Sequence, residues 1–234
     1  MQGINTMQIN IEHIPAVIWG NKSDQVYLFV HGKFSNKAEA EDFARMAGKK
    51  GYQVISFDLP GHGDRKEENY ACHVKDAVHD LRIIGHYVMQ NWSKIYLMAA
   101  SLGAYFSLIS YQELPIERCL FLSPLLNMER LIQNMMLWFQ VGEEELKEKK
   151  EILTPMGETL IWDYYCYVRE HPIQFWNKKT AILYGSQDHL TEYSVVEDFV
   201  RRFGCELTVV EGAQHNFQSK EYTDFADRWL EENI

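Results

Sequence analysis

Residues 95–106 read IYLMAASLGAYF, and the hydroxyl of Ser101 stands there between a strand-like apolar run and a helix-like apolar run. Ala99, Ala100 and Gly103 keep bulk away from it. A strand, then a small-x-Ser-x-Gly turn, then a helix is the sequence form of a nucleophile elbow, whose sharp turn lifts the serine above the carboxyl edge of a sheet. The alternative is that Ser101 caps the helix, because serine is a favoured N-cap residue. This stretch alone leaves both interpretations open.

Two later segments present an acid and a histidine directly after apolar runs. YGSQDHLTE (184–192) carries Asp188, and EGAQHNF (211–217) carries His215. Since the carboxyl ends of parallel strands share one edge of a sheet, both side chains are expected to meet Ser101 there. When a carboxylate, an imidazole and a hydroxyl are hydrogen-bonded in series, the imidazole can take the proton of the hydroxyl. The hydroxyl oxygen then acts as a nucleophile toward carbonyl groups. Taken singly, the acid also fits a turn and the histidine a loop. The alternative acids are Asp163 and Asp198.

Acyl transfer also requires two N–H donors directed at the oxygen that becomes negatively charged. The first is expected to be the N–H of Leu102, directly after the serine. The second is expected from FVHGKFSNK (29–37), which ends a strand-like run with His-Gly and enters a loop. We assign the second donor to Lys33, with Phe34 as the second choice.

These residues must be positioned by a regular alternation of strands and helices. Near-continuous apolarity in short runs is typical of strands buried on both faces, and the runs are 26–30, 53–57, 95–99, 119–122, 181–185 and 206–210. An earlier pair, 7–12 and 16–19, interrupted by Pro15, is expected to form an antiparallel edge hairpin. Apolar residues recur at helical spacing in 37–50, 73–92, 102–112, 192–203 and 219–232. The alternation predicts an α/β fold with a doubly wound, mostly parallel sheet.

The alternation stops between residues 124 and 176. No strand-like run occurs there, and the helical pieces are 127–139, 143–151 and 156–170. We therefore predict a helical insertion, 124–176, within a core made of 1–123 and 177–234. Its charge run, EEELKEKKE, is interpreted as a solvated helix face.

Composition limits the partners and the compartment. The 234 residues carry a formal net charge of −10, which disfavours binding to nucleic acid or to an anionic membrane. No run is long enough to span a membrane, and MQGINTMQIN lacks the features of a secretory signal. The protein is expected to be cytoplasmic, with reduced thiols. Because the cysteines and histidines lack metal-binding spacing, no metal is expected. No cofactor is expected either. The cysteines are Cys72, Cys119, Cys166 and Cys205.

Taken together, the motifs resemble the α/β-hydrolase-fold family of serine hydrolases, of the esterase, lipase and acyl-peptidase-like kind. The similarity spans about residues 25–232, and its pieces are VHGKFSN, DLPGHGDR (58–65), AASLGA, YGSQDHL and EGAQHNF. The order Ser, Asp, His along the chain is the family's order. The resemblance implies that 124–176 is the family's cap and that DLPGHGDR forms a tight loop beside the site.

Two residues depart from the family's pattern. Lys33 follows His-Gly, where an aromatic or apolar residue is common, and would bring a cation to the mouth of the pocket. Arg65 stands where a small residue usually closes the DLPGHG motif, which predicts a differently shaped loop.

The resemblance implies a carboxylesterase that uses an acyl-enzyme and acts on a small ester with an apolar or aryl part. Amide or peptide-bond hydrolysis on the same triad is an alternative, and a non-catalytic ligand-binding relative is another. The expected partner is a small-molecule substrate; the sequence leaves the oligomeric state open. Aromatic side chains of the insertion also fit plain packing against the core. The candidate pocket residues are Phe34, Met135, Trp138 and Trp162.

Overall fold

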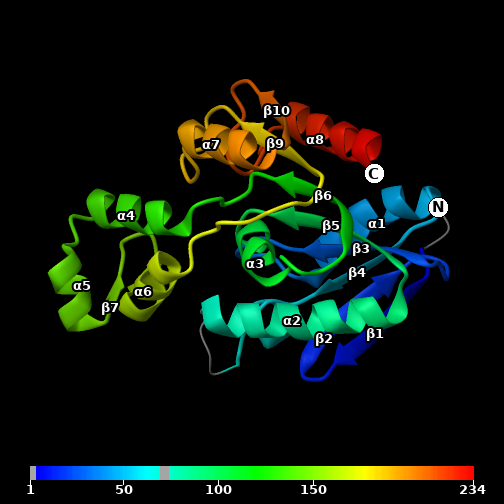
Figure 1. Ribbon diagram of the computed structural model, residues 1–234, viewed down its shortest axis with the longest axis horizontal. Helices are drawn as coiled ribbons and strands as arrows, with labels where there is room; N and C mark the ends of the chain where they lie inside the picture. Colours follow the sequence, from blue (N-terminus) through cyan, green and yellow to red (C-terminus); the bar gives the residue numbers. More distant parts are fainter. Residues whose placement is uncertain (1–3, 69–73) are drawn as a thin grey trace.

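An eight-stranded sheet runs through the computed structural model, which describes residues 4–68 and 74–234 (Figure 1). In spatial order its strands are β1 (Thr6–Ile11), β2 (Ile14–Trp19), β4 (Gln53–Phe57), β3 (Gln25–Val30), β5 (Lys94–Ala100), β6 (Ile116–Leu122), β9 (Thr180–Gly185) and β10 (Glu206–Val210). β2 pairs antiparallel with both β1 and β4, and all remaining neighbours are parallel. The predicted α/β fold with a mostly parallel sheet is therefore confirmed.

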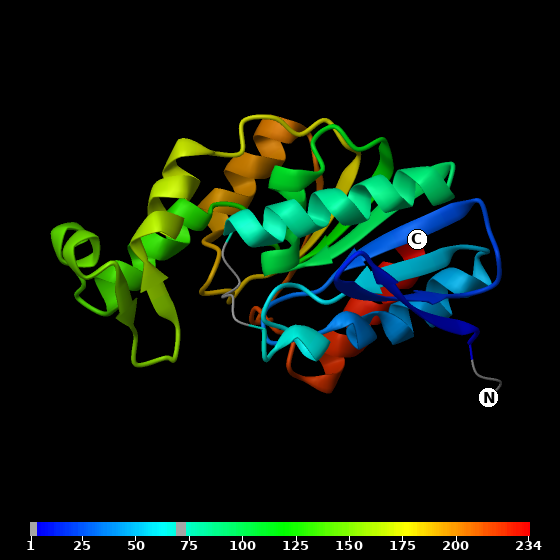
Figure 2. The same cartoon turned by 90° about the horizontal axis from the view of Figure 1, so that it is seen from below.

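Helices cover both faces of this sheet (Figure 2). They are η1 (Lys37–Glu39), α1 (Ala40–Lys49), η2 (Gly63–Arg65), α2 (Val74–Asn91), α3 (Leu102–Ser110), α4 (Met128–Trp138), α5 (Glu143–Lys149), α6 (Trp162–Glu170), α7 (Tyr193–Phe203) and α8 (Lys220–Asn233). α1 and α8 pack on one face, and α2, α3 and α7 on the other. Cys72 and the predicted helix start at residue 73 lie outside the described residues. Within 4–68 and 74–234, no helix has the length and apolarity needed to cross a membrane.

The central strand β3 illustrates why the sheet is buried on both sides. Val26, Leu28 and Val30 belong to the core cluster under α2 and α3, whereas Tyr27 and Phe29 belong to the cluster under α1. All five are at most 3% exposed. Burial of one such side chain contributes about 1.5–3 kcal/mol, so both faces of the strand stabilise the fold.

The predicted N-terminal hairpin is confirmed, with β1 as the edge strand. Pro15 lies inside β2, opposite Asn10, instead of ending it. The missing N–H is tolerated near the start of the strand, and the Pro15 carbonyl accepts a hydrogen bond from the N–H of Asp58 at 3.0 Å.

The insertion extends beyond the sheet in both views (Figures 1 and 2). Helix α4 lies within the predicted piece 127–139, whereas α5 and α6 cover only part of 143–151 and 156–170. The expectation that the segment contains no strand was wrong. Glu151–Leu153 (β7) and Thr159–Ile161 (β8) form an antiparallel hairpin. Strands of three residues are too short to show a period of two in the sequence. We call this β7–β8 unit the insertion hairpin.

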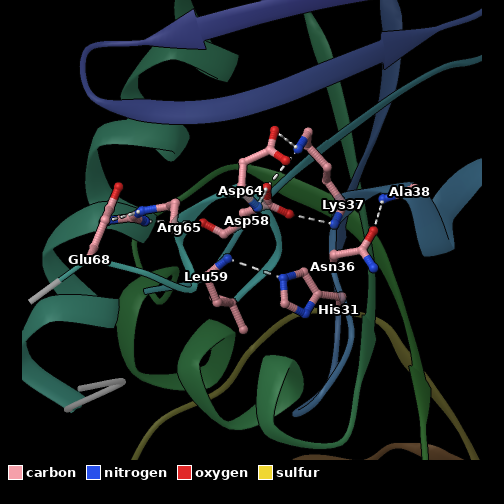
Figure 3. Close-up of polar contacts among 9 residues, drawn as sticks. All are labelled: His31, Asn36, Lys37, Ala38, Asp58, Leu59, Asp64, Arg65 and Glu68. Carbon is pink, nitrogen blue, oxygen red and sulfur yellow. Dashed lines mark hydrogen bonds and ion pairs between the residues drawn. The ribbon is translucent and has the colours of Figure 1, made fainter. Parts of the chain in front are cut away.

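Buried charges join the loops that follow β3 and β4 (Figure 3). The Asp58 carboxylate, 0% exposed, accepts hydrogen bonds from the N–H of Lys37 (2.8 Å), from Lys37 Nζ (2.6 Å) and from the N–H of Asp64 (3.0 Å). Burial lowers the pKa of Lys37, but hydrogen bonds to Asp58 and Asp64 outweigh it, so that pKa lies above its ordinary value. Gly63 is required here, because a Cβ would lie 2.2 Å from an Asp58 oxygen.

Arg65 is fully buried. Its contacts explain why an arginine stands where the resemblance leads one to expect a small residue. One guanidinium nitrogen donates to the carbonyl of Asp58 at 3.1 Å and to the carboxylate of Asp80, on α2, at 2.7 Å. Asp80 also lies 3.2 Å from His13 in the β1–β2 turn. The side chain therefore ties the DLPGHGDR loop to a helix, a role that a small residue cannot fill.

His31 directly follows β3, and its buried ring bridges the same two loops. Its Nε2 accepts a hydrogen bond from the N–H of Leu59 at 3.1 Å, so Nδ1 carries the proton and donates to the carbonyl of Gly32 at 2.7 Å. Burial lowers the pKa of His31 to about 4, and the ring is neutral near pH 7.

Replacing Arg65 by methionine is expected to lower the free energy of unfolding by about 3–5 kcal/mol, because Asp80 would keep a buried charge without its guanidinium. Urea denaturation measures the change. Arg45→Met is the matched control, since Arg45 pairs with Glu41 on the exposed surface of α1 and such pairs contribute at most about 1 kcal/mol. Equal losses in the two variants would contradict the proposed role of Arg65.

The low pKa of His31 makes stability depend on pH. As the pH falls below 6.5, His31 becomes protonated in the unfolded chain, whereas in the folded protein it stays neutral until about pH 4. The free energy of unfolding should therefore fall by up to about 3 kcal/mol as the pH drops through this window. His31→Gln should remove that part of the slope in urea titrations, whereas His86→Gln, on the exposed side of α2, should retain it. Identical slopes in wild type and His31→Gln would refute the assignment.

Candidate active site

Ser101 occupies a strained turn between β5 and α3. Its φ of 48° and ψ of −116° lie outside the regions that L-residues favour, which costs on the order of 1–3 kcal/mol. The turn is held from β6, because the N–H of Ser101 donates to the Leu122 carbonyl at 3.0 Å and its carbonyl accepts from the N–H of Leu125 at 3.2 Å. The serine side chain makes no capping hydrogen bond to α3. The interpretation of Ser101 as a side-chain cap is therefore wrong.

The small residues around the serine have a steric cause. A Cβ on Gly103 would lie 2.4 Å from the carbonyl oxygen of Val30 and 2.5 Å from that of His31. Only glycine lets α3 approach the end of β3 so closely. Ala99 is completely buried on the other side of the turn, so its methyl group fits without displacing the backbone.

The three sequence-predicted side chains meet at the carboxyl edge of the sheet. Nε2 of His215 lies 2.8 Å from Oγ of Ser101, and Nδ1 lies 2.7 Å from Oδ2 of Asp188. An ionised carboxylate only accepts, so Nδ1 carries the proton and Nε2 is free to accept the serine hydroxyl. The other Asp188 oxygen accepts from the N–H groups of Leu190 (2.8 Å) and Thr191 (3.2 Å). The Asp188 side chain is 0% exposed and that of His215 is 13% exposed.

The alternative acids lie elsewhere. Asp198, on α7, pairs with Arg201 at 2.8 Å on the surface. Asp163 lies in the first turn of α6, in the insertion. His215 hydrogen-bonds through its ring to Asp188 and Ser101, so neither alternative occupies the acid's position.

The loop that carries His215 is anchored on both sides. The Oγ of Ser123 donates to the His215 carbonyl at 2.7 Å, and Ser123 itself has a φ of 43°. Phe217, buried in the core, has its carbonyl held by the hydroxyl of Thr223 at 3.0 Å. The imidazole is therefore presented by a backbone with little freedom.

Two backbone N–H groups lie beside the serine. Leu102 is the first residue of α3, where N–H groups have no intrahelical partner. Gly32 lies against the nucleophile, since a Cβ on it would be 3.4 Å from the Cβ of Ser101. Because His31 binds the Gly32 carbonyl, the trans peptide directs the N–H of Lys33 the opposite way. In the described part of the chain, neither the Leu102 nor the Lys33 N–H donates to a protein acceptor.

The side chains of Lys33 and Phe34, in the loop after β3, reach outward. Phe34 is 85% exposed with a φ of 62°, and the ammonium of Lys33 lies 5.3 Å from the centre of its ring. Lys33 also forms an ion pair with Glu158 of the insertion hairpin. No local pattern indicates this partner, which is 125 positions away along the chain.

The insertion is joined to the core near the loop that carries Asp188. Glu192, just before α7, accepts hydrogen bonds from Arg130 at 3.0 Å and from Asn134 at 2.9 Å, both on α4. The hydrogen bond from Asn134 and then those from Arg130 lower the pKa of Glu192. Sequence reasoning missed this contact, because an isolated glutamate at a helix start carries no distinguishing pattern.

The other candidate pocket residues lie in the insertion. Met135 and Trp162 are partly buried against the core cluster, and Trp138 is 45% exposed at the end of α4. A hollow of about 220 Å³ beside His215 is lined by Gln187, His189, Leu190, Gln214, Asn216 and Gln218. A larger hollow of about 380 Å³ lies between α4, α6 and α7, away from the three converging side chains. The pocket role of the four predicted residues stays a prediction.

Among the residues that the structure describes, no three His, Cys, Asp or Glu side chains are placed to hold a metal ion together. Cys119, Cys166 and Cys205 are free thiols.

Solved structures with the same fold include several hydrolases. Est1E from Butyrivibrio proteoclasticus, solved with ferulic acid bound, is 16% identical, with 97% of this chain and 96% of that chain covered and a TM-score of 0.74. The alpha/beta hydrolase domain-containing protein 10 from mouse is 15% identical, with 98% of each chain covered and a TM-score of 0.75. The Pyrococcus furiosus esterase PF2001 is 20% identical, covers 98% and 89%, and gives a TM-score of 0.69.

These likenesses establish the fold. No curated protein sequence matches the chain. The family model described as serine aminopeptidase, S33, matches residues 21–153, a segment that contains the His-Gly loop, the DLPGHGDR loop and the turn at Ser101. Because the match covers more than half of the 234 residues, the chain belongs to this family of α/β hydrolases.

Proposed function

We propose that the protein is a serine hydrolase that cleaves a carboxylic ester through an acyl-enzyme, with Ser101 as nucleophile, His215 as base and Asp188 as the orienting acid. The observation that carries the proposal is the continuous hydrogen-bonded chain from the serine oxygen through the imidazole to the buried carboxylate, 2.8 and 2.7 Å long. The strained backbone at Ser101 also supports the proposal, because such strain clusters at functional sites.

In the proposed mechanism, Oγ of Ser101 attacks the carbonyl carbon while Nε2 of His215 takes the hydroxyl proton. Asp188 stabilises the resulting imidazolium. The N–H groups of Leu102 and Lys33 donate to the oxyanion, each interaction lowering the barrier by about 3 kcal/mol. The imidazolium then protonates the departing alcohol, and the acyl-enzyme remains. Water, deprotonated by the same imidazole, attacks it, and the acid leaves as the serine regains its proton.

The proposed substrate is a small ester with an apolar or aryl part, and residues 124–176 are assigned as the cap over it. The exposed ring of Phe34, next to the second oxyanion donor, is suited to contact such a group. Among the structural neighbours, Est1E was solved with ferulic acid, an aryl acid, and PF2001 is named an esterase. Phe34 comes from the core, and Met135, Trp138 and Trp162 would contribute from the insertion.

Hydrolysis of an amide or peptide bond is the second candidate, since the family description is that of a serine aminopeptidase. Both reactions use the same triad and oxyanion donors. A panel of matched p-nitrophenyl esters and p-nitroanilides, graded by acyl length, separates them. Faster turnover of the anilides would replace the ester proposal by the amide one.

Ser101→Ala is expected to reduce kcat/KM for p-nitrophenyl butyrate by about 10⁴-fold or more, because no other group replaces the nucleophile. The variant should also fail to react with a fluorophosphonate probe that labels the wild type at Ser101. Ser194→Ala, on the exposed surface of α7, serves as the control and should retain both properties. Wild-type activity in Ser101→Ala would eliminate the proposed nucleophile.

Asp188→Asn should reduce kcat by about 10⁴-fold, since an amide in place of the carboxylate favours the wrong imidazole tautomer. Steady-state kinetics on the same ester measure the loss. Asp198→Asn is the control, because this carboxylate lies on the surface of α7, and its kcat should stay within twofold of wild type. If the two variants lose activity equally, Asp188 is not the orienting acid.

A further inference from the structure

Lys33 adds a positively charged side chain to the loop that carries a proposed oxyanion donor. Its backbone N–H is one of the two proposed donors, and Gly32 before it lies against Ser101. The ammonium lies 5.3 Å from the centre of the Phe34 ring. A carbonyl substrate on Ser101 therefore reacts beside a residue whose side chain carries a full charge.

This charge is neutralised by a residue from a different part of the chain. The Glu158 carboxylate forms an ion pair with Lys33 Nζ, and its side chain is 20% exposed against 40% for the lysine. Glu158 thus approaches the active site from the insertion, whereas Lys33 belongs to the core loop after β3.

The insertion hairpin holds Glu158 in a defined place. The N–H of Thr154 donates to the Glu158 carbonyl at 2.7 Å, and the N–H of Gly157 donates to the Thr154 carbonyl at 2.9 Å. Gly157 closes this turn with a φ of 81°. Leu160, two residues after the glutamate, is 2% exposed and anchors β8. The carboxylate is therefore carried by a structured turn.

We propose that Glu158 is a specificity-determining residue: by neutralising Lys33 beside the oxyanion hole, it makes the site select esters with uncharged acyl groups. The inference rests on the proposed function and deepens it. Without Glu158, the lysine would attract an acyl group that ends in a carboxylate. Without Lys33, the glutamate would repel the same group. At the short range of this site one unpaired charge changes the preference by roughly three- to tenfold.

A purely mechanical role of the ion pair makes a different prediction. If the pair only fastened the insertion hairpin, removing either partner would loosen the hairpin in the same way. A charge role requires that the two removals act in opposite directions on the preference for an anionic acyl group.

The test compares p-nitrophenyl butyrate with mono-p-nitrophenyl succinate, an ester of similar length whose acyl group ends in a carboxylate. The measured quantity is the ratio of kcat/KM for the succinate to that for the butyrate. Glu158→Gln should raise this ratio about three- to tenfold, and Lys33→Met should lower it. The double variant should return close to the wild-type ratio, and the shifts should fade in 0.5 M NaCl, because salt screens exposed charges.

Glu151→Gln is the matched control, because Glu151 is an exposed carboxylate in β7 of the same hairpin; its ratio should equal that of the wild type. An unchanged ratio in Glu158→Gln, or shifts of the same sign in Glu158→Gln and Lys33→Met, would overturn the inference. Fluorophosphonate labelling of wild-type Ser101 and turnover of the butyrate ester are scored first. If both fail, the proposed function falls and takes the inference with it; if both succeed and the ratio does not respond, only the inference falls.

Discussion

The contact between α3 and the end of β3 is the constraint on which the candidate site depends. The carbonyl oxygens of Val30 and His31 occupy the space that any side chain at Gly103 would need. That approach forces the tight turn at Ser101 and its positive φ. It also brings the first N–H of α3 next to the loop that begins at Gly32. One steric contact thus positions the hydroxyl and both candidate oxyanion donors, and the rest of the sheet keeps it in place.

The buried charges around Asp58 act on shape more than on net stability. Burying an ion pair costs desolvation free energy that largely offsets the attraction between the charges. These charges instead connect the loops after β3 and β4 to α2, through Lys37, Asp58 and Arg65. His31 adds a neutral bridge between the same loops, and through the Gly32 carbonyl it orients the Gly32–Lys33 peptide. The loop after β3 is thereby held by buried groups on the neighbouring loop and on α2.

Local patterns in the sequence sufficed for the sheet and for the three converging side chains. Apolar runs indicated the strands. Because Ser101, Asp188 and His215 each follow such a run, their meeting at one edge of the sheet could be predicted. The insertion hairpin was missed because strands of three residues have no readable period. The burial of Arg65 was missed because a charged residue is expected at the surface unless its partner is known. Contacts such as Lys33 with Glu158 depend on the folded path of the insertion, which no local pattern encodes.

The hydrogen bond from Ser123 to the His215 carbonyl has a consequence for building chimaeras of this fold. Ser123 directly follows β6 and precedes the segment predicted to be the insertion, so the root of that segment and the backbone of the histidine loop share one tether. A foreign insertion joined after residue 123 would preserve that tether. A junction made before it would also exchange the group that holds the loop of His215. Transplanting the insertion would then disturb the histidine even with Ser101, Asp188 and His215 all retained.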